Sequence, residues 1–177
     1  MKLLRIVFAI VAIGASVAAG QAQVRKSTVP GITNFAQVET TVACAGATTP
    51  ESAGAIKKMG FASIVNLRLA SEQGANIEAQ EAAAKTAGIT YIHLPFSGAT
   101  ADPAVVDQFI KIVTEPRNQP AFIHCASGNR AAAMWFIKRV LIDKWDTERA
   151  SEEAAQLGLT SSALKTFALN YIKNHNQ

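Results

Sequence analysis

Short apolar runs along the chain alternate with longer segments whose apolar residues recur at helical spacing. The short runs, which predict strands, cover residues 35–43, 62–67, 90–94 and 120–124. The longer segments predict helices over residues 49–60, 77–87, 102–115, 129–141, 147–157 and 160–174. Strands that alternate with helices are typical of a mostly parallel central sheet flanked by helices, so we expect an α/β fold.

The helix expected over 129–141 differs from the others because apolar residues surround it almost completely. Residues 131–137 are all apolar, so we expect this helix to be buried rather than amphipathic. The polar segment 24–33 predicts an irregular lead-in to the first strand. No linker divides residues 23–177, which we therefore expect to form one domain.

The first 22 residues have the pattern of a signal peptide. Lys2 and Arg5 form a basic start, an apolar run follows, and small residues precede a cleavage site that we place after Ala22, with Gly20 as the alternative. The apolar run is short for a membrane span, although an uncleaved anchor is the other interpretation. We expect a periplasmic or secreted protein of bacterial type that has no membrane segment after cleavage.

Composition and charge exclude several classes of protein. The 177 residues are 49% hydrophobic and 17% charged, which excludes a disordered chain. Of the 17 basic residues, two lie in the signal segment, so 15 basic and 13 acidic residues remain in 23–177. This near balance, without a cluster of basic and aromatic residues, gives no support for nucleic-acid binding.

The segment from His124 to Arg130 carries the candidate chemistry. Cys125 follows a predicted strand, and Arg130 lies at the start of the buried helix. Ligands bind at the carboxyl ends of parallel strands, and helix N-termini bind anions. We expect a small anion to be held by Arg130, as a planar fork, and by the loop amides of Ala126, Ser127, Gly128, Asn129 and Arg130. The same groups favour the thiolate form of Cys125, which is the nucleophilic form.

His124-Cys125, followed by Arg130, resembles the signature of the cysteine-dependent protein tyrosine and dual-specificity phosphatases. The likeness extends over residues 34–158, including 62–69 and the segment 91–98, which resembles the strand and loop that carry the general acid. Within this family the chain looks most like the bacterial beta-lactamase-hydrolase-like phosphatases. The resemblance implies hydrolysis of phosphate monoesters of a protein or small molecule, of phosphotyrosine or aryl type. It further implies a phosphocysteine on Cys125 and no cofactor.

The loop departs from the phosphatase signature in two ways. Four residues separate Cys125 from Arg130 where the signature has five, and Ala131 stands where a Ser or Thr is usual. This Cys-x4-Arg loop also resembles that of rhodanese sulfurtransferases, which carry a persulfide on the cysteine. The Asp-x-Arg strand and the Gly-His-Ile-Pro-like turn of rhodaneses are missing. A non-catalytic anion-binding or redox module is the third hypothesis.

Four more side chains are candidates near the site. Asp102 is the only carboxylate between Pro95 and the next helix, so it is either the general acid or only a helix cap. His124 is expected to orient the loop by hydrogen bonds. Arg68 either holds a substrate anion or is a solvated arginine. Cys44 either packs in the core or forms a reversible disulfide with Cys125. No histidine combines with a cysteine at metal-ligand spacing, so we expect no metal.

Overall fold

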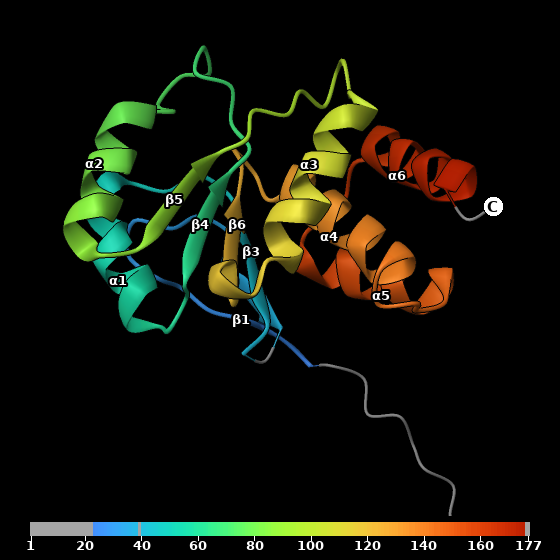
Figure 1. The fold of residues 1–177 in the computed structure, drawn as a ribbon, viewed down its shortest axis with the longest axis horizontal. Coiled ribbons are helices and arrows are strands. Elements are labelled where there is room, and N and C mark those ends of the chain that lie inside the picture. The colour runs from blue at the N-terminus through green and yellow to red at the C-terminus, as the bar shows by residue number, and fades with distance from the viewer. Residues whose placement is uncertain (1–22, 39, 176–177) are drawn as a thin grey trace, which may run out of the picture.

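A six-stranded sheet in the order β1-β2-β3-β6-β4-β5 forms the centre of the molecule (Figure 1). The computed structural model describes residues 23–38 and 40–175. The strands are β1 (Val24–Lys26), β2 (Ala36–Val38), β3 (Val42–Ala45), β4 (Ser63–Asn66), β5 (Thr90–His93) and β6 (Ala121–His124). The helices are α1 (Ala53–Lys58), α2 (Ile77–Ala87), α3 (Pro103–Thr114), α4 (Asn129–Leu141), α5 (Thr147–Leu157) and α6 (Ser162–His175). Single 3₁₀ turns precede α1 at Pro50–Ser52 and follow α3 at Pro116–Asn118.

Four of these strands are parallel, which confirms the predicted α/β class with a mostly parallel sheet. β6 lies between β3 and β4, and β5 pairs with the far side of β4. The register places Ala45, His124, Asn66 and His93, the last residues of the four strands, side by side. The loops after these strands therefore meet at one edge of the sheet, where a ligand site is expected.

The antiparallel side of the sheet corrects two of the sequence predictions. Residues 35–43 do not form one strand: β2 and β3 make a hairpin in which the Thr41 amide bonds to the Val38 carbonyl, 3.0 Å away. The turn escaped detection because its threonines are β-branched residues that favour strands. The lead-in 24–33 contains β1, which pairs with β2 and is only three residues long.

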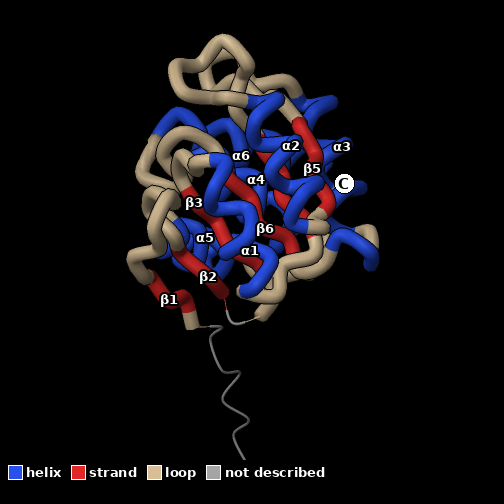
Figure 2. The backbone as a smooth tube through the Cα atoms, turned by 90° about the vertical axis from the view of Figure 1, so that its left-hand side faces the viewer, coloured by secondary structure: helices blue, strands red, loops and turns tan. Residues whose placement is uncertain are grey.

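Helices cover both faces of the sheet. α1 and α2 lie over one face, which is turned toward the viewer in Figure 2, and α3 to α6 lie over the other. α4 packs between the sheet and the pair α5 and α6. As predicted, it is buried on all sides, and the residues 131–137 are at most 3% exposed.

The central strand β6 divides its side chains between two cores. Phe122 packs against Phe35 and Phe61 on the side of α1 and α2. Ile123 and Cys125 belong to the larger core under α3 to α6. Because the strand is buried at every position, it gives the loop that follows it a rigid base.

In residues 23–38 and 40–175, none of the helices combines the length and the apolar character that crossing a bilayer requires. The predicted signal peptide, residues 1–22, lies outside the described residues.

Candidate active site

The loop that joins β6 to α4 runs from Cys125 to Gly128, at the edge where the parallel strands end. Gly128 has a φ of 99°, in the left-handed region that side chains rarely adopt. A Cβ on this residue would stand 3.7 Å from the Ala45 carbonyl, which is an ordinary contact. The backbone conformation, and not a lack of space, therefore requires glycine at this position.

Cys125 lies fully buried at the base of this loop. The Gly128 amide donates a hydrogen bond to its sulfur, with N and Sγ 3.1 Å apart. The amides of Asn129 and Arg130 follow in the first turn of α4, where N–H groups have no acceptor within the helix. Together with the positive end of the helix dipole, these amides make this end of α4 attractive to anions.

Arg130 is fixed by four hydrogen bonds. Its guanidinium donates to both carboxylate oxygens of Glu72, at 2.6 and 2.9 Å, and to the carbonyls of Leu67 and Phe96 at 3.1 and 2.9 Å. Burial alone lowers the pKa of Arg130, but its bonds to Glu72 and the nearby Cys125 sulfur raise that pKa above its ordinary value overall. The guanidinium is therefore a permanent positive charge beside the cysteine.

Glu72 is a site residue that the sequence did not reveal. It also accepts hydrogen bonds from the Leu69 amide at 2.9 Å and from Arg68 Nε at 3.1 Å. The hydrogen bond from Arg130 is the main reason that the pKa of Glu72 falls to about 2, so the carboxylate is ionised at neutral pH. Its one sequence signal is a carboxylate shortly after β4, at the edge of the sheet where the site lies.

Arg68 organises the loop after β4. Besides Glu72, it donates to the carbonyls of Gln73 and Gly74 at 2.6 and 2.8 Å, and its side chain is 5% exposed. These bonds engage the donors of the Arg68 side chain with the loop that follows β4, and the bond to Glu72 helps to position that carboxylate. Direct binding of a substrate anion by Arg68 stays a prediction.

His124 is buried on the face of the sheet toward α1 and α2, where it packs near Phe122. Neither of its ring nitrogens makes a well-aligned hydrogen bond with a described residue, although interactions with the backbone of Cys125 and Gly46 act to raise its pKa. Its orienting role therefore stays a prediction. Burial is the main reason that its pKa falls to about 3, and the charges of Arg68 and Arg130 act in the same direction. His124 is therefore neutral at physiological pH.

Asp102 lies exposed at the start of α3, where its Oδ1 accepts a hydrogen bond from the Ala104 amide at 2.9 Å. This is the geometry of a helix N-cap, the simpler of its two predicted roles. Its role as a general acid stays a prediction.

Cys44 is a free, buried thiol in β3 and belongs to the same core as Cys125, which is also free. Burial raises the pKa of Cys44, and the charge of Cys125 raises it further. Cys44 is therefore protonated and unreactive at neutral pH. A disulfide between the two cysteines stays a prediction.

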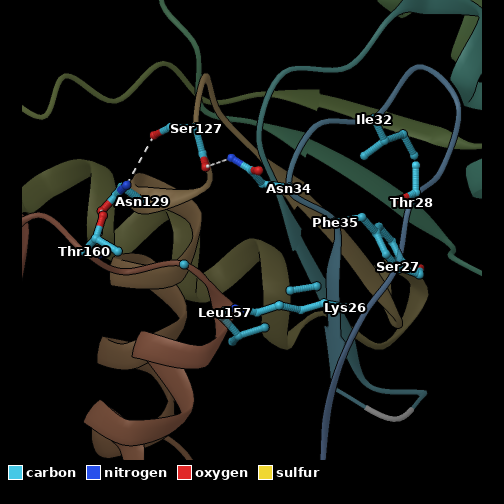
Figure 3. Close-up of a pocket in the computed structure, with 12 residues that line it drawn as sticks. Lys26, Ser27, Thr28, Ile32, Asn34, Phe35, Ser127, Asn129, Leu157 and Thr160 are labelled. Carbon is cyan, nitrogen blue, oxygen red and sulfur yellow. Dashed lines mark hydrogen bonds between the residues drawn. The ribbon is translucent and has the colours of Figure 1, made fainter.

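Two asparagines hold the outer side of the active loop (Figure 3). Asn34 donates to the Ser127 carbonyl at 3.1 Å. Asn129 accepts from the Thr160 and Ser161 amides at 2.7 Å each, just before α6, and donates to the Ser127 hydroxyl at 3.3 Å. The loop is therefore tied to the segment before β2 and to the turn before α6.

Comparison with known sequences identifies relatives of this arrangement. The sequence model of a family described as "DSP-PTPase phosphatase fused to NAD+ Kinase" matches residues 16–170. A protein named beta-lactamase hydrolase-like protein, from Xylella fastidiosa, is 30% identical over 104 residues. That alignment covers 57% of this chain and 23% of the relative, so the chain spans about a quarter of the relative's length.

Solved structures of phosphatases share the fold. TpbA of P. aeruginosa matches with a TM-score of 0.65 and 19% identity, over 86% of this chain and 90% of TpbA. A putative phosphatase from Shewanella putrefaciens matches at 0.69 and 15%, over 82% and 95%. The catalytic domain of the PP-IP phosphatase SIW14 from S. cerevisiae matches at 0.65 and 22%, over 84% and 93%. These likenesses confirm the predicted cysteine-dependent phosphatase fold.

Proposed function

We propose a mechanism for this chain on the premise that it belongs to the family described as a DSP-PTPase phosphatase fused to NAD+ kinase. It is a phosphatase of the tyrosine and dual-specificity type. In our proposal Cys125 is the nucleophile, and Arg130 with the loop amides binds the phosphoryl oxygens. The observation that carries this proposal is the fixed guanidinium beside a buried sulfur that already accepts the Gly128 amide.

The reaction proceeds in two displacements at phosphorus. First, the Cys125 thiolate forms a bond to phosphorus while the bond to the ester oxygen breaks, and the leaving alkoxide or phenolate takes up a proton. Water then attacks the phosphocysteine, loses a proton, and releases inorganic phosphate and the thiolate. Negative charge builds on the phosphoryl oxygens in both steps, and the loop amides and Arg130 are placed to stabilise it.

The leaving group decides how much the reaction needs a general acid. Asp102 is the proposed acid, and it stands on the loop after β5 that precedes α3. Phenolates leave with less protonation than alkoxides do. We therefore propose that aryl phosphates, including phosphotyrosine, are better substrates than alkyl phosphates.

Two related structures support a phosphoester substrate of a protein or small molecule. TpbA has been solved in complex with pTyr, and SIW14 is named a PP-IP phosphatase. We further propose that residues 1–22 direct the chain to the periplasm or outside the cell. N-terminal sequencing of the protein from a periplasmic fraction tests this, and a mature chain that begins at Gln23 is expected.

Turnover of p-nitrophenyl phosphate by the purified protein under reducing conditions tests the function. We expect hydrolysis by the wild type and by Cys44→Ser, the control for the other buried thiol, and none by Cys125→Ser. If the wild type hydrolyses no phosphoester but forms thiocyanate from thiosulfate and cyanide, the sulfurtransferase hypothesis replaces this proposal. If neither reaction occurs, the loop only binds anions.

A further inference from the structure

A cleft of about 670 Å³ adjoins the outer side of the active loop. Ser127 and Asn129 line one side of it with Thr160, and Figure 3 shows Phe35, Ser27 and Thr28 across from them. Its volume is within the range of sites that hold small organic molecules. Because Ser127 and Asn129 belong to both the loop and the cleft, a group bound in the cleft lies next to the proposed phosphoryl site.

The lining of the cleft combines an apolar wall with one positive charge. Ile32, Phe35 and Leu157 supply apolar surface, and Ser27 and Thr28 supply hydroxyl groups. Lys26 is the only ionisable side chain among the described residues that line the cleft, and no carboxylate opposes it. The cleft therefore favours a ligand that has an apolar body and carries a negative charge.

Two amide side chains of the lining are bonded to the active loop and to the turn before α6. Asn34 donates to the Ser127 carbonyl, and Asn129 is bonded to Ser127 and to the turn before α6. These bonds fix one wall of the cleft, so that its shape is set before a ligand arrives. A preformed wall and a single cation give selectivity for the position of the ligand's charge.

We infer that this cleft receives a second anionic group carried by the substrate beside its phosphoryl group, and that Lys26 pairs with this anion. The inference depends on the proposed phosphatase function. It specifies the substrate as an aryl phosphate with a further carboxylate or phosphate nearby. An acidic residue next to a phosphotyrosine and a carboxylate on a small aryl phosphate present the same chemistry.

Arg25 provides a matched control for Lys26. The two residues are neighbours in β1, both are exposed, and both carry one positive charge. Successive side chains of a strand point to opposite faces, and only Lys26 lines the cleft. Lys26→Gln and Arg25→Gln therefore change the net charge equally, but only Lys26→Gln removes a charge from the cleft.

The experiment measures kcat/KM for two pairs of substrates. One pair is two phosphotyrosine peptides that differ only in a glutamate or glutamine beside the phosphotyrosine, and the other is phenyl phosphate with and without a carboxylate. We expect Lys26→Gln to lower the ratio of kcat/KM for the acidic member to kcat/KM for the neutral member about fivefold in at least one pair, which is the effect of losing an exposed ion pair. Arg25→Gln should leave this ratio unchanged. The pair that responds identifies whether a peptide or a small molecule supplies the anion.

Ser27→Trp is a second variant, which fills the cleft without changing its charge. It should lower kcat/KM for both peptides relative to p-nitrophenyl phosphate, whose leaving group is small. The inference is wrong if the Lys26 and Arg25 variants give the same preferences and Ser27→Trp does not discriminate against the peptides. An absence of turnover with every phosphoester refutes the proposed function itself, whereas turnover without these selective losses refutes the cleft alone.

Discussion

Glu72 and Arg130, which are 58 residues apart in sequence, meet through two hydrogen bonds of 2.6 and 2.9 Å. The side chains are 22% and 11% exposed, so the pair is largely shielded from water. Together with the bonds to the Leu67 and Phe96 carbonyls, this contact fixes the guanidinium of Arg130, whose charge interacts with Cys125. A residue outside the signature thus determines where the signature arginine points.

Glu72→Gln should lower kcat/KM about 100-fold, because a displacement of a catalytic group by about 1 Å has effects of this size. The loss should appear with good and poor leaving groups alike, since Arg130 binds the phosphoryl group in both. The control is Glu115→Gln, which removes the partner of Arg117 in an exposed ion pair with a distance of 3.8 Å. Its activity should match that of the wild type, and equal losses in both variants would contradict the assigned role of Glu72.

The stability of the protein should fall in acid because His124 is held neutral. Its pKa is lowered to about 3 in the folded protein, whereas an unfolded chain protonates histidine at about 6.5. The unfolded state therefore binds more protons between these values. The stabilising contribution is present in full above about pH 6.5 and is lost as the pH falls toward 3.

Urea unfolding at several pH values measures this dependence. In His124→Gln the free energy of unfolding should change less between pH 7 and pH 4 than in the wild type. The lowered pKa of Glu72, about 2, also makes the protein less stable in acid, but over a lower pH range, because its carboxylate in an unfolded chain titrates at about 4.3. Equal slopes for the variant and the wild type above pH 5 would show that His124 does not cause the acid sensitivity.

Two substitutions distinguish the two possible roles of Asp102, because one removes only its charge and the other also removes the oxygen that caps α3. Asp102→Asn keeps an N-cap for α3, whereas Asp102→Ala removes the acceptor of the Ala104 amide and should cost about 1 kcal/mol of stability. If Asp102 is the general acid, Asp102→Asn lowers turnover of alkyl phosphates much more than of p-nitrophenyl phosphate. Small, equal losses of turnover for both substrates would show that Asp102 acts only as the N-cap of α3.

Gly128→Ala tests the shape of the active loop. The φ of 99° makes any side chain at this position unfavourable by about 1–2 kcal/mol, and relaxation of the loop would move the amide that bonds to Cys125. Gly60 has a similar φ of 92° at the end of α1, with open space around its Cβ position. Both alanine variants should lose stability, but only Gly128→Ala should lose activity. Full activity in Gly128→Ala would contradict the proposed cradle.

Much of the fold could be predicted from local patterns because each parallel strand is a buried apolar run between capped helices. The loop from Cys125 to Arg130 was equally accessible, since its chemistry lies within six consecutive residues. The hairpin of β2 and β3 was not, because Thr40 and Thr41 are residues that also suit strands. β1 is too short for a periodic pattern and depends on its pairing with β2.

The rest of the candidate site depends on contacts between distant segments. Glu72 approaches Arg130, and Asn34 approaches Ser127, only after the sheet brings their loops to one edge. Neither residue belongs to a short motif. The side chain of His124 packs in the core under α1 and α2, close to Phe122, so its surroundings also depend on distant segments.

Rapid quenching of the reaction, followed by mass spectrometry of the peptide that contains Cys125, tests the account most directly. During turnover of p-nitrophenyl phosphate in acid-quenched samples, the wild type should carry one phosphoryl group on Cys125, and Cys44 should stay unmodified. Glu72→Gln should form this adduct more slowly. Continued hydrolysis by Cys125→Ser, with no phosphoryl group on Cys125 of the wild type at any time, would contradict the mechanism.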